Sequence, residues 1–193
     1  MKQAAFPVTK TLEDLDRSVS PVPAATLDYL ASLEWIRAAE NLCLVGPPGT
    51  GKSHLLVALG VAAVQAGHKV RYFTAAELAE TLYRGLADNS VGRVIDTLLR
   101  NDLIIIDEVG FAPLDDTGAQ LLFRVVAAAY ERRALGIASH WPFESWGRFL
   151  PEHTTAVSLL DRLLHHANVV ITDGDSYRMR QARAKGGTTL TKT

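Results

Sequence analysis

A glycine-rich run in the first third of the chain contains the residue types that bind phosphate. Residues 46–53 have the sequence Gly-Pro-Pro-Gly-Thr-Gly-Lys-Ser and fit the pattern GxxxxGK[S/T] in full. Gly49 and Gly51 let the backbone curl so that several N–H groups face phosphate oxygens. Lys52 adds a full charge at the β and γ phosphates, and the Ser53 hydroxyl is placed to ligate Mg²⁺. The pattern predicts a nucleotide site, whereas a glycine-rich turn without a ligand would leave the lysine and the hydroxyl unexplained.

Two acidic residues supply the second half of the predicted site. Asp107 and Glu108 directly follow Leu103-Ile104-Ile105-Ile106, the clearest buried strand in the chain. Ligands of open α/β sheets bind at the carboxyl ends of strands. There Asp107 can hold Mg²⁺ together with Ser53, and Glu108 can polarise an attacking water. The alternative is that both carboxylates only cap the strand end at the surface. ATP and Mg²⁺ are the expected ligands, and the residues expected to bind them are Gly46, Pro47, Pro48, Gly49, Thr50, Gly51, Lys52, Ser53, His54 and Asp107.

Apolar strands that alternate with amphipathic helices must position these residues. Strands are predicted at 41–46, 69–73, 103–106, 135–139 and 168–172. Helices are predicted at 26–40, 52–66, 75–86, 91–100, 117–133, 143–149 and 155–166. Strands that are apolar throughout favour a parallel sheet covered on both faces. One strand and two helices between Lys52 and Asp107 fit the additional-strand ATPases, with sheet order 5-1-4-3-2. About twenty polar residues follow the last strand, so no C-terminal helical lid is expected.

Composition sets outer limits on the function. The 193 residues are 48% hydrophobic and 21% charged, which is typical of one globular domain. Twenty Lys and Arg against 21 Asp and Glu give a formal net charge of −1. The net charge therefore does not indicate a strongly basic surface for nucleic-acid binding. With Cys43 as the single cysteine, we expect neither a disulfide scaffold nor a four-ligand zinc site. We expect a reducing, cytoplasmic setting and no membrane partner.

The longer motifs resemble those of one ATPase family. Thr11-Leu12-Glu13-Asp14, the phosphate loop followed by His54, residues 161–166 and Ser176-Tyr177-Arg178 are similar to the IstB-like ATPases. These are helper proteins of insertion-sequence transposition within the AAA+ superfamily, related to the DnaC helicase loaders. The resemblance extends from about Lys10 to Arg180 and implies an AAA+ type P-loop NTPase core. The family usually carries a small helical module before this core, and we expect this chain to lack it.

The resemblance also implies roles for three further residues. Arg162 matches an arginine that reaches a neighbouring subunit's nucleotide in trans, where a guanidinium can neutralise charge on the γ phosphate. The alternative is a surface pair of Asp161 and Arg162 on an amphipathic helix. Ser139 and His140 stand where the family's sensor residues are usually Thr-Ser-Asn. Either side chain can hydrogen-bond, and an imidazole titrates near neutral pH; otherwise His140 is an ordinary polar residue beside Trp141.

The resulting hypothesis is an ATP-dependent helper protein for transposition. ATP would drive assembly of a homo-oligomer on double-stranded DNA and recruitment of a transposase, with hydrolysis resetting the assembly. The alternatives are a DnaC-like replicative helicase loader, a small-molecule kinase and a remnant of the family that binds ATP without hydrolysing it.

The chain is expected to divide into an extended lead-in at 1–25, the ATPase core at 26–175 and a basic tail at 176–193. Lys and Arg residues of the tail could contact the DNA backbone, or the tail could simply be solvated. The adjacent His165 and His166 raise the question of a metal site. On a helix, neighbouring side chains point about 100° apart, and no nearby carboxylate or thiol completes a ligand set. We therefore expect no metal there.

Overall fold

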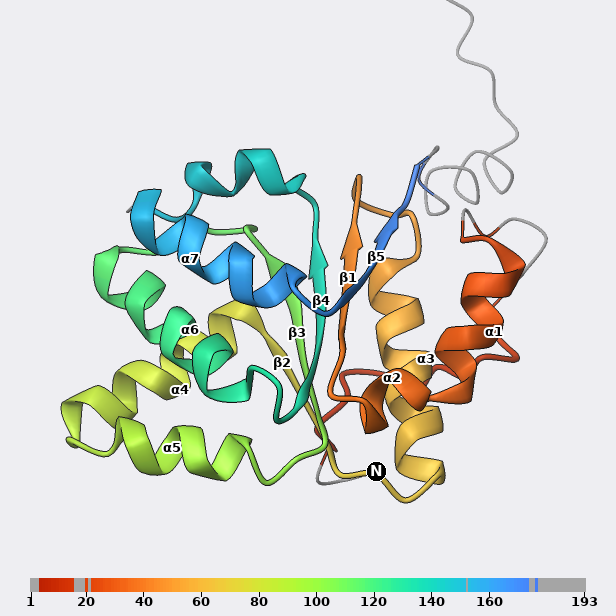
Figure 1. Ribbon diagram of the computed structural model, residues 1–193, viewed down its shortest axis with the longest axis horizontal. Coiled ribbons are helices and arrows are strands. Elements are labelled where there is room, and N and C mark those ends of the chain that lie inside the picture. Colours follow the sequence, from red (N-terminus) through yellow and green to blue (C-terminus); the bar gives the residue numbers. More distant parts are fainter. Residues whose placement is uncertain (1–3, 16–19, 21, 152, 174–175, 177–193) are drawn as a thin grey trace, which may run out of the picture.

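The apolar runs form one five-stranded parallel sheet in the computed structural model (Figure 1). The structure describes residues 4–15, 20, 22–151, 153–173 and 176. The strands are β1 (Asn41–Val45), β2 (Val70–Thr74), β3 (Leu103–Val109), β4 (Ala134–Ser139) and β5 (Ala167–Ile171). Their order is β2-β3-β4-β1-β5, which confirms the predicted order 5-1-4-3-2.

Helices cover the two faces of this sheet (Figure 1). One face carries α1 (Ala24–Ser32), α2 (Glu34–Arg37) and α3 (Lys52–Gln65). The other carries α4 (Ala75–Ala87), α5 (Val91–Leu98), α6 (Asp116–Ala129) and α7 (His153–Leu164), with the short 3₁₀ helix η2 (Phe143–Arg148) near the end of β4. Leu42 and Leu44 of β1 pack toward α3 and Cys43 packs toward the opposite face, as the two-residue period of a strand requires. Burial raises the pKa of the Cys43 thiol to about 12, which makes it an inert core residue.

The helix predicted at 26–40 is interrupted at one residue. Leu33 adopts the left-handed conformation, with φ 60°, and separates α1 from α2. The turn brings Trp35 into the core, where its side chain is fully buried and its indole N–H donates to the Leu30 carbonyl at 3.1 Å. Burial of a large indole with its polar atom satisfied outweighs the cost of one left-handed residue.

Two other predictions of burial were wrong. In the amphipathic helix predicted at 75–86, Leu86 shares one helical face with Leu78 and Leu82, but 46% of it is exposed. Its neighbour Gly85 packs closely on α5, where a Cβ would lie 2.9 Å from Val94. At the edge of the sheet, Val169 and Ile171 of β5 are also exposed, so β5 is not covered on both faces.

The first described residues pack on the α3 side of the sheet. Ala4 is buried there, and the Phe6 ring meets the Tyr72 ring edge-on with centroids 6.2 Å apart. Phe6 also lies against Gly60 of α3, where a Cβ would approach it to 2.8 Å. The predicted tail at 176–193 lies outside the described residues except for Ser176. None of the described helices is long and apolar enough to cross a membrane.

Candidate functional site

Three segments of the predicted site meet at the carboxyl ends of neighbouring strands. The loop at 46–51 follows β1, Asp107 and Glu108 lie near the end of β3, and Ser139 and His140 lie at the end of β4. Strand β4 lies between β1 and β3, so the sensor positions stand between the phosphate loop and the two carboxylates. This edge is where ligands of open parallel sheets bind.

Glycines shape the phosphate loop at two places. Gly51 has φ 93° and immediately precedes α3, whose first residue is Lys52. The backbone N–H groups at the start of this helix are therefore available to an anion. Gly46 has φ 149°, and a Cβ there would lie only 2.0 Å from the Thr172 carbonyl oxygen. The loop thus passes directly against the end of β5.

Thr172 is a buried brace that the motif did not reveal. Its hydroxyl lies 2.7 Å from the Thr50 hydroxyl, and its N–H donates to the Val45 carbonyl at 2.7 Å. Ser176 is also close, because a Cβ on Gly49 would lie 2.1 Å from its Oγ. Thr172 and Ser176, which follow β5, therefore both lie against the phosphate loop. Tyr177 and Arg178 of the same family-like motif lie outside the described residues.

The Lys52 ammonium is buried inside the loop. Its Nζ donates to the Gly46 and Pro47 carbonyls, each at 2.6 Å. Thr50 closes the loop with a hydroxyl bond of 2.9 Å to the Pro47 carbonyl. Ser53, by contrast, is exposed on the first turn of α3. A fixed cation and an accessible hydroxyl thus stand at one helix N-terminus.

His54 carries a buried polar atom that has no hydrogen-bond partner among the described residues. This atom is Nε2, which lies out of contact with solvent. The segment Thr11–Asp14 comes near it and closes a reciprocal turn, because the Thr11 N–H donates to Asp14 and the Asp14 N–H donates to the Thr11 hydroxyl. These hydrogen bonds lower the pKa of Asp14, with a smaller contribution from the charges of Lys10 and His54. An unpaired buried nitrogen beside the loop is suited to a further polar ligand.

Asp107 is held by two donors. It is 3% exposed, and its two oxygens accept from the Tyr72 hydroxyl at 3.0 Å and the Glu108 N–H at 2.8 Å. Burial and the charge of Asp107 raise the pKa of Tyr72, so its hydroxyl stays protonated and donates. Tyr72 was not among the site residues predicted from the sequence. The available signal was a tyrosine in an apolar strand, since a buried tyrosine hydroxyl needs a partner.

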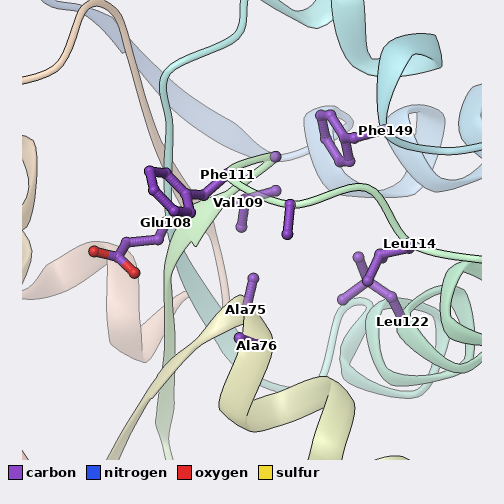
Figure 2. Close-up of a pocket in the computed structure, with 10 residues that line it drawn as sticks. Ala75, Ala76, Glu108, Val109, Phe111, Leu114, Leu122 and Phe149 are labelled. Carbon is purple, nitrogen blue, oxygen red and sulfur yellow. The ribbon is translucent and has the colours of Figure 1, made fainter.

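Glu108 interrupts the regular geometry of β3. It has φ 59°, a conformation that few non-glycine residues adopt, and the register with β4 shifts between Ile106 and Val109. The result is an exposed carboxylate beside the buried Asp107. Figure 2 shows the Glu108 carboxylate directed away from the apolar side chains that line a pocket behind it. That pocket, at about 60 Å³, is too small for a nucleotide.

The two sensor candidates have different surroundings. Ser139 is buried, and its hydroxyl accepts from the Trp141 N–H at 3.1 Å and donates to the Trp141 carbonyl at 3.2 Å. His140 is half-buried between Trp141 and the exposed ring of Phe111. Burial lowers the pKa of His140, and the charge of Lys52 lowers it further. His140 is therefore the sensor candidate whose electrostatic surroundings include the charge of Lys52.

Arg162 is packed against its own chain. Its guanidinium lies over the Phe123 ring of α6, 5.0 Å from the centroid, and donates to the Ser158 carbonyl at 3.1 Å. The described contacts thus place Arg162 on the α6–α7 surface. A role in a neighbouring subunit would require the side chain to leave Phe123.

The residues present fit a magnesium nucleotide. The left-handed glycines, the cation inside the loop and the unpaired His54 nitrogen suit phosphate oxygens and polar groups of a nucleotide. Ser53 and Asp107 are the oxygen donors that would hold Mg²⁺. Bound Mg²⁺ would neutralise phosphate charge during transfer.

Strand order distinguishes the classes of phosphate-loop proteins. Placement of β4 between β1 and β3 matches solved AAA+ proteins, so the fold is that of a P-loop NTPase core of the AAA+ type. The sequence profile described as IstB-like ATP binding protein matches residues 1–185. The chain belongs to this family.

Known relatives come from insertion sequences. A protein of insertion sequence IS21 from Pseudomonas aeruginosa, named for ATP binding, is 37% identical over 194 residues, covering 100% of this chain and 73% of its own length. A similarly named protein of IS5376 from Geobacillus stearothermophilus is 33% identical over 184 residues, covering 95% of this chain and 73% of its own.

Among solved structures, AMPPCP-bound DnaA from Aquifex aeolicus superposes with a TM-score of 0.66 at 21% identity, over 94% of this chain and 57% of the DnaA chain. The DnaC helicase loader superposes with a TM-score of 0.64 at 17% identity, over 77% of this chain and 87% of the loader chain. These two likenesses show the fold. This chain spans only a little over half the length of the DnaA chain.

Proposed function

We propose that the protein hydrolyses ATP and uses the cycle to control an assembly on DNA that recruits a transposase. The observation that supports ATP hydrolysis is the position of two adjacent carboxylates, buried Asp107 and exposed Glu108. They lie near the end of β3, and β4 separates them from the phosphate loop. A site that only stored nucleotide would not need a second carboxylate in a strained left-handed conformation.

Each residue has a distinct part in this proposal. Lys52 exchanges its two loop carbonyls for phosphate oxygens, and the N–H groups at the start of α3 bind the same oxygens. Asp107 and Ser53 would hold Mg²⁺, and Tyr72 orients Asp107. Glu108 accepts a proton from the attacking water as the water oxygen bonds to the γ phosphorus and the bond from that phosphorus to the β–γ bridging oxygen breaks, which releases ADP and phosphate. His140 lies beside Lys52 and would contact the same end of the triphosphate.

The proposed binding to DNA and to a transposase is supported by the insertion sequences that encode the relatives and by the charges at the surface of this chain. The relatives named above belong to insertion sequences, which favours a transposase as the partner. Arg93 and Arg100 are exposed on and just after α5, and the basic tail supplies more cations. Such charges support sequence-independent contact with the phosphate backbone of double-stranded DNA.

Arg162 is proposed to act in trans within a homo-oligomer. On assembly, the Arg162 guanidinium would leave the Phe123 ring and the Ser158 carbonyl and would contact a phosphate bound to a neighbouring subunit. Mixing Arg162→Ala protein with Glu108→Gln protein tests this, because only mixed interfaces combine an intact Glu108 with an intact Arg162. Turnover should recover in the mixture. Arg148→Ala is the matched control, since Arg148 also lies over an aromatic ring, that of Trp141.

ATP turnover with and without double-stranded DNA tests the core of the proposal. Measurements at about 50 and 200 mM salt should show stimulation that fades as salt rises. Lys52→Ala should abolish nucleotide binding, whereas Glu108→Gln should retain binding and lose about 10²-fold or more of the turnover rate. Binding without turnover in the unmodified protein would indicate a non-hydrolysing member of the family and overturn the proposal.

A replicative helicase loader remains the competing partner assignment, because the DnaC loader shares this fold. Parallel capture of the purified protein by a transposase and by a replicative helicase distinguishes the two. Binding to the helicase alone would refute the transposition role while leaving ATP hydrolysis intact.

A further inference from the structure

Three potential metal ligands lie close together at the amino-terminal ends of the strands, at the end of the sheet opposite the phosphate loop. His165 and His166 lie between α7 and β5, and Glu131 lies in the turn between α6 and β4. One ligand atom from each residue lies within 4.8 Å of the other two, and all three side chains are exposed. This edge contains the start of β1, because Asn41 pairs with Ala167.

The expectation that these histidines diverge was wrong. Helix α7 ends at Leu164, so His165 and His166 lie in the turn that follows it, although the His165 N–H still donates to the Asp161 carbonyl at 3.2 Å. Their ring centroids are only 4.1 Å apart. The missing carboxylate comes from Glu131, which is distant in sequence and is brought there by the packing of α6 on α7.

One of the three ligand distances already fits a tetrahedral ion, and the other two are at most 4.8 Å. Two ligand atoms on one Zn²⁺ lie about 3.3 Å apart when each bond is about 2.0–2.1 Å long. The Glu131 Oε1 and His166 Nε2 atoms are 3.4 Å apart. His165 has to approach by no more than about 1.5 Å, which a rotation of an exposed side chain can supply.

Neighbouring groups hold this cluster in place. The Tyr130 hydroxyl lies 2.7 Å from His165 Nδ1, which restrains the ring and favours Nε2 as its ligand atom. The backbone is fixed by buried Asn41, whose N–H donates to the His166 carbonyl at 2.7 Å and whose side chain bonds both the Leu163 carbonyl and the Leu135 N–H. Asn41 thus ties together the two chain segments that carry the ligands.

We infer that His165, His166 and Glu131 bind one divalent transition-metal ion of the Zn²⁺ class. Two imidazole nitrogens and one carboxylate suit Zn²⁺, Ni²⁺ or Cu²⁺ better than Mg²⁺ or Ca²⁺, which prefer oxygen ligands. A fourth, solvent ligand completes the tetrahedron. The ion links the α6–β4 turn to the α7–β5 turn, at the end of the helix that carries Arg162.

Titration of the tag-free full chain with ZnCl₂ tests this inference, by calorimetry without nucleotide, phosphate or chelator. We expect one ion per chain, and His166→Ala and Glu131→Gln should each weaken binding by about tenfold or more. Co²⁺ should give the visible absorption of a four-coordinate site, and both substitutions should abolish it. Because all three ligands are exposed, the variants should keep the circular dichroism spectrum of the unmodified protein.

His68→Ala is the matched control. His68 Nδ1 lies 3.7 Å from Asp102 Oδ2, which makes it a histidine beside a carboxylate without a second imidazole. This substitution should leave Zn²⁺ affinity and stoichiometry unchanged. Absence of Zn²⁺ binding at micromolar concentration, or binding that survives both His166→Ala and Glu131→Gln, would overturn the inference. Equal weakening by His68→Ala would do the same, because it would show diffuse histidine binding.

Discussion

The hydrogen bond from Tyr72 to Asp107 makes a quantitative prediction, because the chain contains a second tyrosine–aspartate bond of the same kind. Tyr83 donates to Asp115 at the start of α6. Each aspartate also accepts one backbone N–H, from Glu108 at 2.8 Å in the first pair and from Gly118 at 2.7 Å in the second. The pairs differ in burial. Tyr72 is 6% exposed and Asp107 3% exposed, whereas Asp115 lies at the surface.

Tyr72→Phe removes one donor from a buried carboxylate and changes little else. A hydrogen bond to a charged group contributes about 1.5–3 kcal/mol, and here water cannot readily replace the lost donor. A change of this size lowers the melting temperature of a domain of this length by about 3–12 °C. Tyr83→Phe removes the equivalent donor where water can replace it, so its cost should stay within about 0.5 kcal/mol.

Urea denaturation of both variants, without nucleotide, measures the two costs under the same conditions. We expect Tyr72→Phe to cost at least about 1 kcal/mol more than Tyr83→Phe, at unchanged dependence on urea. A double-mutant cycle of Tyr72→Phe with Asp107→Asn isolates the pair itself. Equal and small losses for the two phenylalanine variants would refute the conclusion that Tyr72 restrains Asp107.

Three further predictions concern glycine, asparagine and histidine. Gly51→Ala should lower the free energy of unfolding by about 1–2 kcal/mol, because only its positive φ opposes a side chain. Gly46→Ala should lower it further, because its Cβ would lie 2.0 Å from a buried carbonyl oxygen. Equal losses for the two variants would contradict this prediction. Asn41→Ala removes two buried hydrogen bonds and should cost about 2–4 kcal/mol by urea denaturation, so a loss under about 1 kcal/mol would argue against its bracing role. NMR titration should place the pKa of His140 below its ordinary value of 6.5, and Lys52→Met should raise it. Because the folded-state pKa is the lower one, stability should fall as pH drops below about 6.5, and His140→Asn should reduce that loss.

The phosphate loop and the carboxylates at the end of β3 could be predicted because local sequence determines them. The strand order could be predicted because one strand and two helices between Lys52 and Asp107 fit the additional-strand ATPases. A glycine-rich loop between a strand and a helix has one common use, and strands that are apolar throughout indicate a parallel sheet. Features that depend on approach between distant segments could not be found in this way. Tyr72 reaches Asp107 only because β2 pairs with β3, and Thr172 braces the loop only because β5 pairs with β1.

Helix ends were the other source of error. Leu33 breaks a well-formed helical pattern because the core gains Trp35 by the turn, which is a tertiary effect. His165 and His166 fall outside α7 by one or two residues, and that small shift changes two diverging side chains into a pair of neighbouring ligands. In both cases, the residue at which a helix ends determines which side chains come into contact.

The central position of β4 also determines how wide the site is. Neighbouring strands lie about 4.8 Å apart, so β1 and β3 are held roughly 10 Å apart by two ladders of backbone hydrogen bonds. Residues 75–102, which carry α4 and α5, lie outside these two ladders. β4 forms one side of each ladder and is closely packed, because a Cβ at Gly136 would lie 3.2 Å from Leu56 of α3. β4 is therefore the spacer of the nucleotide site, and changes to its backbone alter the gap that a triphosphate must bridge.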